Sequence, residues 1–200
     1  MKFQVLKKFT AALLTMTVIF CNANALIFAN AAEKNTLDSQ TQINYKGERK
    51  LDFDSDWKFH WQETTNEKEM IDASAQNYDD SGNDWKPVDL PHDWCPEMGF
   101  NENGIGNTGF SYGGTGWYRK TFTLPDELEG KKIDIQFDGV HMLSDVWING
   151  THLGQWPYGY TTFNYDLTPY LKFDGENTVA VRVVNRQPNS RWYSGGGINR

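Results

Sequence analysis

Beyond position 50, the hydrophobic residues of this chain recur at every second position in short runs. Residues 131–140 and 177–185 show this pattern most clearly. A period of two places alternate side chains on one face of a strand. The expected inward positions are Ile133, Ile135, Phe137, Val179, Val181 and Val183. Because the runs end in Gly, Asn, Asp or Pro, which are typical of turns, the pattern predicts an all-β fold.

Further strands are predicted from the same signals. Residues 57–61 alternate large aromatic side chains, and residues 117–124 alternate until Pro125 stops the strand. Residues 146–148 lead into Asn149-Gly150, the strongest short hairpin signal, because both central residues of a type I′ turn need a positive φ. About seven strands in roughly 150 residues, with no strong amphipathic helix, favour a two-sheet β-sandwich of jelly-roll type.

Two segments depart from the strand pattern. In residues 166–171, Asp166 is expected to cap a short helical turn that tolerates Pro169 near its start. Residues 63–84 are too acidic and polar for a central strand. They are expected to form a long excursion, with one helical turn around residues 67–75.

The first 31 residues resemble a secretory signal peptide. Three lysines precede the apolar residues 11–20, and both Ala29-Asn30-Ala31 and Ala23-Asn24-Ala25 fit the small-x-small cleavage rule. The apolar run is too short for a stable membrane span, so we expect cleavage after Ala31 and no membrane span in the mature chain. An uncleaved membrane anchor is the alternative. Residues 32–48 are polar and lack an apolar period, which predicts a linker before a domain at residues 49–200.

Charge and cysteine content narrow the function classes. Removal of the three leader lysines leaves 16 basic and 26 acidic residues, a net charge of −10. This balance argues against nucleic acid or an anionic membrane as a partner. Cys95 is then the single cysteine, so no intramolecular disulfide is expected. The four histidines show no metal-ligand spacing, and the run Asp52/Asp54/Asp56 lacks the glycine and closing Glu of a calcium loop, so we expect no metal site.

Five blocks, in one order, resemble the N-terminal sugar-binding domain of the glycoside hydrolase family 2 enzymes. Within that family, the RWY block is most similar to exported bacterial β-galactosidases. Asn199 stands where the family usually has an aromatic residue. The blocks are LDFDSDWKF at 51–59, LPHDW at 90–94, GWYRK at 116–120, WINGTHLGQWPYGYTTFNYDLTPYL at 147–171 with NTVAVRV at 177–183, and SRWYSGGGINR at 190–200.

The resemblance implies a galactose-binding-domain-like jelly roll in an enzyme secreted by a bacterium or held at its surface. The two catalytic Glu residues of this family lie on a later (β/α)8 barrel, and none of the ten Glu residues here fills that role. We therefore expect a truncated N-terminal piece that is inactive alone. Its partners would be its own downstream immunoglobulin-like and barrel domains. No cofactor is expected in this piece, and any Mg²⁺ or Na⁺ would be held mainly by the absent part.

The resemblance also indicates four substrate-binding candidates, namely Arg191, Trp192, Tyr193 and Asp93. An Arg offers five fixed donors that suit sugar hydroxyls, and aromatic faces stack on sugar C–H groups. The structural alternatives are an Arg that closes the sandwich, rings that pack in the core, and an Asp that caps a turn. His92 is expected to be structural, and residues 195–197 to allow a tight backbone turn.

The predicted substrate is a terminal non-reducing β-D-galactoside cleaved by a retaining β-glycosidase. The alternatives are another specificity of the family, β-glucuronidase or β-mannosidase, and a carbohydrate-binding module without catalysis. A structural surface protein is a third class, but it leaves Arg191, Trp192 and Tyr193 unexplained.

Overall fold

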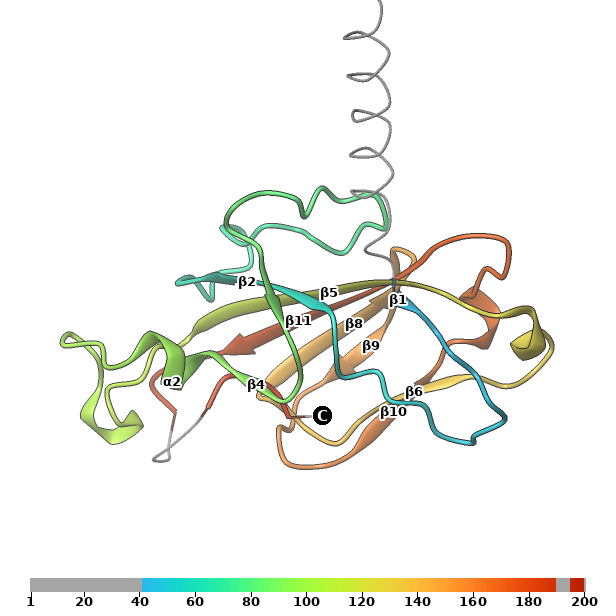
Figure 1. Ribbon diagram of the computed structural model, residues 1–200. Helices are drawn as coiled ribbons and strands as arrows, with labels where there is room; N and C mark the ends of the chain where they lie inside the picture. Colours follow the sequence, from blue (N-terminus) through green and yellow to red (C-terminus); the bar gives the residue numbers. More distant parts are fainter. Residues whose placement is uncertain (1–40, 190–194, 200) are drawn as a thin grey trace, which may run out of the picture. The chain divides into compact units, whose positions relative to one another are not determined.

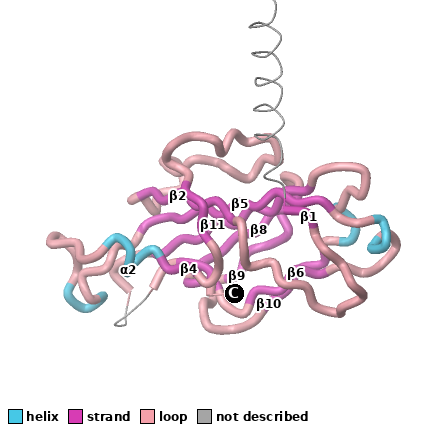
Figure 2. The backbone as a smooth tube through the Cα atoms, in the orientation of Figure 1, coloured by secondary structure: helices cyan, strands magenta, loops and turns pink. Residues whose placement is uncertain are grey.

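The structure, a computed structural model, describes residues 41–189 and 195–199 (Figure 1). Almost all regular structure in this part of the chain is β, and loops make up much of the rest (Figure 2). The helical elements are α2 (Trp94–Met98) and three single 3-10 turns, at Gly106–Thr108, Asp126–Leu128 and Thr168–Tyr170. No helix among the described residues is long and apolar enough to cross a membrane.

The main sheet has the order β3-β2-β5-β11-β8-β9, and each of these neighbours pairs antiparallel. A short additional strand, β1, pairs in parallel with the end of β5. The bounds are Thr41–Gln42 for β1, Trp57–Gln62 for β2, Lys86–Val88 for β3, Gly114–Thr123 for β5, Leu143–Ile148 for β8, Thr151–Trp156 for β9 and Asn177–Asn185 for β11.

Two small antiparallel sheets complete the sandwich. One joins β6 (Asp134–Phe137) to β10 (Phe163–Asp166), and the other has the order β4 (His92–Asp93), β12 (Gly197–Ile198), β7 (Val140–His141). Their apolar side chains share one buried cluster with the main sheet. Members of this core include Trp57, Phe59, Tyr118, Phe122, Ile135, Phe137, Val140, Val146, Phe163, Val181 and Ile198. The predicted β-sandwich is therefore confirmed.

Several local predictions are also confirmed. Asn149 and Gly150 have φ of 51° and 80°, as a type I′ turn between β8 and β9 requires. The strand predicted at residues 177–185 is β11, and its alternate valines lie in the core. Asp166 accepts a hydrogen bond from the backbone N–H of Thr168 at 2.9 Å, at the start of the predicted helical turn.

One prediction is confirmed and one needs correction. The excursion contains a single helical turn, in which the backbone N–H of Met70 donates to the carbonyl of Asn66 at 3.2 Å. Beyond this turn the chain is not helical, and Ala73 is fully buried against the sheet. The predicted linker at residues 32–48 also contains part of the fold, since β1 pairs with β5 and Ile43 is buried. Its two-residue strand is too short to show a period.

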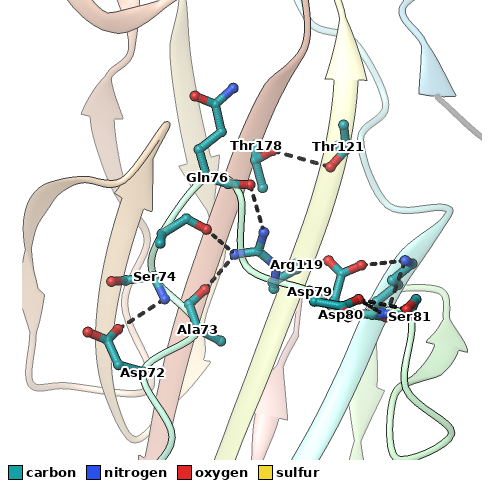
Figure 3. Close-up of polar contacts among 12 residues, drawn as sticks. Asp72, Ala73, Ser74, Gln76, Asp79, Asp80, Ser81, Arg119, Thr121 and Thr178 are labelled. Atoms are coloured by element: carbon teal, nitrogen blue, oxygen red, sulfur yellow. Dashed lines mark hydrogen bonds and ion pairs between the residues drawn. The ribbon is translucent and has the colours of Figure 1, made fainter.

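A buried arginine fixes the excursion to the outer face of the main sheet (Figure 3). Arg119 on β5 is 2% exposed, and its Nε donates to Asp80 at 2.8 Å. Its two terminal nitrogens donate to the backbone carbonyls of Ala73, Ala75 and Gln76. Because one planar fork satisfies three carbonyls and a carboxylate, it holds the excursion in one conformation. A second apolar cluster packs the excursion against the sheet, and its buried members are Ala73, Trp85, Trp117 and Ala180.

Candidate functional site

The candidate site is the corner where β4, α2 and β12 meet. Asp93 ends β4 with extended backbone angles and is the N-cap of α2. Its Oδ1 accepts from the backbone N–H of Cys95 at 2.9 Å and from that of Gly196, also at 2.9 Å. Asp is among the best N-cap residues because its carboxylate satisfies an N–H that the helix leaves unpaired. Here the same oxygen also binds the backbone of Gly196, the residue before β12.

Residues 195–197 must be glycine because neighbouring groups approach their backbone closely. A Cβ on Gly195 would overlap the carboxylate of Asp93, and one on Gly196 would overlap the indole ring of Trp94. Gly197 has φ of 149°, in the region that favours glycine. The backbone N–H of Trp94 donates to the carbonyl of Gly196 at 3.0 Å. The predicted tight turn of this glycine run is therefore confirmed.

A second contact joins the end of β11 to the backbone just before β12. Asn185, the last residue of β11, is fully buried, and its amide Nδ2 donates to the carbonyl of Gly195 at 3.1 Å. Arg191, Trp192 and Tyr193 lie outside the described residues. The hydrogen bond between Asn185 and Gly195 joins described residues that precede and follow them in the sequence.

Asp93 is the predicted substrate-binding residue that the structure describes. It is exposed, yet its Oδ1 is occupied by two backbone donors. Its Oδ2 accepts no hydrogen bond from the described residues. Asp93 therefore acts as a structural cap, and only its second oxygen is available to a ligand hydroxyl.

His92 has the structural role that the sequence predicts. Its Nδ1 lies 2.7 Å from the hydroxyl of Tyr118, and its Nε2 lies 3.1 Å from Oε1 of Glu97. Burial lowers the pKa of His92, although Glu97 opposes the shift. Burial also raises the pKa of Tyr118. A neutral imidazole therefore donates from Nε2 to the Glu97 carboxylate and accepts at Nδ1 from the tyrosine O–H.

Sequence reasoning missed His141 on β7. Both Asp93 and His141 are paired in register with Gly197, so they flank β12 on opposite sides. Both ring nitrogens of His141 are buried without a hydrogen-bond partner in the described part of the chain. Burial lowers its pKa, against the charge of Asp93. The ring of Tyr160, which is 69% exposed, lies 5.1 Å away. No periodic or motif signal distinguishes this histidine in the sequence.

The corner contains one buried thiol, that of Cys95. Burial, followed by the charge of Asp93, raises the pKa of the Cys95 thiol to about 12, so the thiolate is scarce at neutral pH. Among residues 41–189 and 195–199, no group of three or more His, Cys, Asp or Glu is placed to hold a metal ion. The contacts of Asp93 and Asn185 at this corner hold the backbone of Cys95, Gly195 and Gly196 in place.

Comparison with known proteins shows which family the chain belongs to. The profile of the glycosyl hydrolases family 2 sugar-binding domain matches residues 49–195. The chain belongs to glycoside hydrolase family 2. Within this family it corresponds to the sugar-binding domain, which confirms the resemblance drawn from the sequence motifs.

The family 2 relatives are much longer than this chain. β-Galactosidase BoGH2A of Bacteroides ovatus is 51% identical over 152 residues, which are 74% of this chain and 17% of that protein. A putative β-glucuronidase of Formosa agariphila is 46% identical over 149 residues, 73% of this chain and 14% of that protein. A β-glycosidase structure from Bacteroides vulgatus superposes with a TM-score of 0.65 at 44% identity, over 74% of this chain and 19% of that one. The chain thus spans less than a fifth of these relatives.

Proposed function

We propose that this chain is the sugar-binding domain of an exported retaining β-glycosidase that hydrolyses terminal non-reducing β-D-galactosides. Its membership of family 2 supports the glycosidase assignment. The 51% identity to a β-galactosidase supports the galactoside. The leader-like residues 1–31 support export.

The observation that carries the proposed role of the domain is the double contact of Asp93 Oδ1 with Cys95 and Gly196. Together with the Asn185–Gly195 contact, it fixes the backbone of Gly195 and Gly196. Backbone that is already fixed loses little conformational entropy when it contacts a ligand. We propose that Arg191, Trp192 and Tyr193, with Oδ2 of Asp93, shape the glycone site from there.

The catalytic carboxylates belong, in this proposal, to polypeptide beyond this chain. A retaining glycosidase needs a nucleophile and an acid/base about 5–5.5 Å apart. In this proposal the domain contributes binding and orientation, and the proton transfers belong to downstream immunoglobulin-like and barrel domains. Any Mg²⁺ or Na⁺ of the complete enzyme would be bound there too.

β-Glucuronidase is the main alternative, because a putative β-glucuronidase is 46% identical to this chain. A binding module without catalysis is the alternative from another class. Both differ from the proposal in measurable activity, since a glucuronidase would prefer an anionic glycone and a binding module would turn over nothing.

The test is an assay of this chain and of a longer chain that continues beyond Arg200. We expect the longer chain to hydrolyse nitrophenyl β-D-galactoside faster than the β-D-glucuronide or the β-D-mannoside. The 200-residue chain should hydrolyse none of them. Faster hydrolysis of the glucuronide would replace the galactosidase assignment, and no hydrolysis by the longer chain would favour the binding module.

The role of Arg191 is tested in the same longer chain. Arg191→Ala should lower kcat/KM by about tenfold to a hundredfold, the range for loss of charge-assisted hydrogen bonds. Arg186→Ala is the matched control, because Arg186 is exposed and precedes the same segment. Equal effects of both substitutions would contradict a specific role for Arg191.

A further inference from the structure

A small pocket opens between the end of β2 and the loop that follows α2. Its volume is about 170 Å³, smaller than a typical pocket for a drug-sized ligand. Trp61 and Glu63 line it from the β2 side, Asn101 and Tyr112 from the loop, and Gln187 from the segment after β11. None of these residues was predicted from the sequence to bind a ligand.

Two aromatic rings form fixed walls of the pocket. The rings of Trp61 and Tyr112 lie 5.9 Å apart at an interplanar angle of 89°. The indole N–H of Trp61 donates to the carbonyl of Gly113 at 3.0 Å. A Cβ on Gly114 would lie 2.8 Å from that indole nitrogen, so the loop backbone packs closely against the ring. The aromatic walls are therefore positioned before any ligand binds.

The polar groups at the pocket divide into two kinds. Gln187 is already used, since it donates to Oγ of Ser111 at 3.0 Å and accepts from Thr108 at 3.4 Å. The carboxylate of Glu63 and the hydroxyl of Tyr112 have no hydrogen bond or ion pair within the part of the chain that the structure describes. These two groups can therefore bind a ligand without breaking an internal contact.

The charge of the lining indicates the class of ligand. Glu63 is the one carboxylic acid among the lining residues, and no Lys, Arg or His lines the pocket. An anionic ligand would be repelled there. Aromatic faces beside a free carboxylate match a neutral pyranose, whose C–H face stacks on a ring and whose hydroxyls donate to the carboxylate.

We propose that this pocket is a binding position for one neutral hexose unit of a glycan, with Glu63 accepting from its hydroxyls and Trp61 and Tyr112 contacting its ring. The choice of a sugar as ligand rests on the proposed function. The location and the preference for a neutral sugar rest on the pocket itself.

The test is a titration of the 200-residue chain, followed by the indole N–H signals in two-dimensional NMR. With methyl β-D-galactopyranoside, the Trp61 signal should shift saturably with a dissociation constant in the millimolar range. Methyl β-D-glucuronide should bind several-fold more weakly. The signal of Trp57, which is buried in the core, serves as the folding reference.

Charge variants of Glu63 test the assignment without disturbing the aromatic walls. Glu63→Gln should weaken galactoside binding by roughly tenfold and remove the discrimination against the glucuronide. Glu63→Lys should reverse the preference. Glu67→Gln is the matched control, because Glu67 is exposed in the same segment but does not line the pocket. It should bind like the unmodified chain.

Three outcomes would overturn the pocket assignment. The first is no shift of the Trp61 signal at sugar concentrations up to roughly a hundred times 1 mM. The second is equal binding of both sugars, and the third is equal effects of the Glu63 and Glu67 substitutions. Binding by this chain, with no turnover by a longer one, would support the pocket and reject the proposed enzyme. Turnover without binding here would do the reverse.

Discussion

The carboxylate of Asp93 accepts a hydrogen bond from the backbone N–H of Gly196, 103 residues further along the chain. The same oxygen caps α2 through Cys95. One side chain thus joins the start of a helix to the residue before the last described strand. The candidate site is built around this contact, so its geometry depends on it.

Asp93→Ala should therefore destabilise the domain by about 1–3 kcal/mol, because it removes a helix cap and leaves a second backbone N–H without its acceptor. Asp93→Asn should cost less, since its amide oxygen can still accept. Urea unfolding measures both effects. Asp174→Ala is the control, an exposed Asp in a loop, and should change stability by less than about 0.5 kcal/mol. An equal loss in both Ala variants would reject the anchoring role of Asp93.

Gly196→Ala should destabilise the domain by about 1–3 kcal/mol, because its Cβ would overlap the indole of Trp94, which is fully buried and cannot move aside. Gly175→Ala is the matched control, since nothing lies within 4 Å of a Cβ there. That change should be neutral or slightly stabilising. Thermal unfolding of the two variants decides the point, and a Gly196→Ala variant as stable as Gly175→Ala would contradict the close packing.

Most of the sandwich was predictable because its long strands carry their own pattern. The alternation at 177–185 and the Asn149-Gly150 turn are local signals that no tertiary contact overrides. The strands β4, β7 and β12 have two residues each, so they show no period. They form because Ile198 and Val140 reach the core, which only the folded chain reveals.

The site was predictable only in part, for a similar reason. The family motifs pointed to Asp93 and to the glycine run, but the contact between them spans 103 residues and leaves no local trace. His141 was missed because a histidine in a strand looks ordinary until its ring nitrogens prove to be buried. The pocket at Trp61 brings together three separate segments, so no single motif contains it.

Arg119→Lys should release the excursion over the main sheet. A lysine keeps the charge but cannot reproduce the planar fork that reaches three carbonyls and Asp80 (Figure 3). We expect a loss of about 2–4 kcal/mol and faster amide hydrogen exchange in the excursion.

Lys58→Met is the control for Arg119, because Lys58 pairs with the same Asp80 but is half exposed. Exposed ion pairs contribute about 0–1 kcal/mol, so this variant should unfold close to the unmodified chain. If the two variants lost the same stability, Arg119 would contribute only an ordinary ion pair with Asp80 and would not hold the excursion on the sheet.

The final prediction concerns pH. Burial lowers the pKa of both His92 and His141 below the ordinary value of 6.5. Below pH 6.5 the unfolded chain therefore binds protons that the folded chain excludes, so the free energy of unfolding falls as pH decreases. The slope is at most about 1.4 kcal/mol per pH unit for each histidine.

Urea unfolding at pH 8.5, 7.5 and 5.5 measures this dependence. Between pH 8.5 and 7.5 both histidines are neutral in either state and should contribute no change, whereas stability should drop by pH 5.5. His141→Gln should reduce that drop, because its side chain binds no proton. Equal stability of the chain at pH 7.5 and 5.5 would contradict the lowered pKa of the two histidines. A His141→Gln variant with the full drop would contradict the contribution of His141.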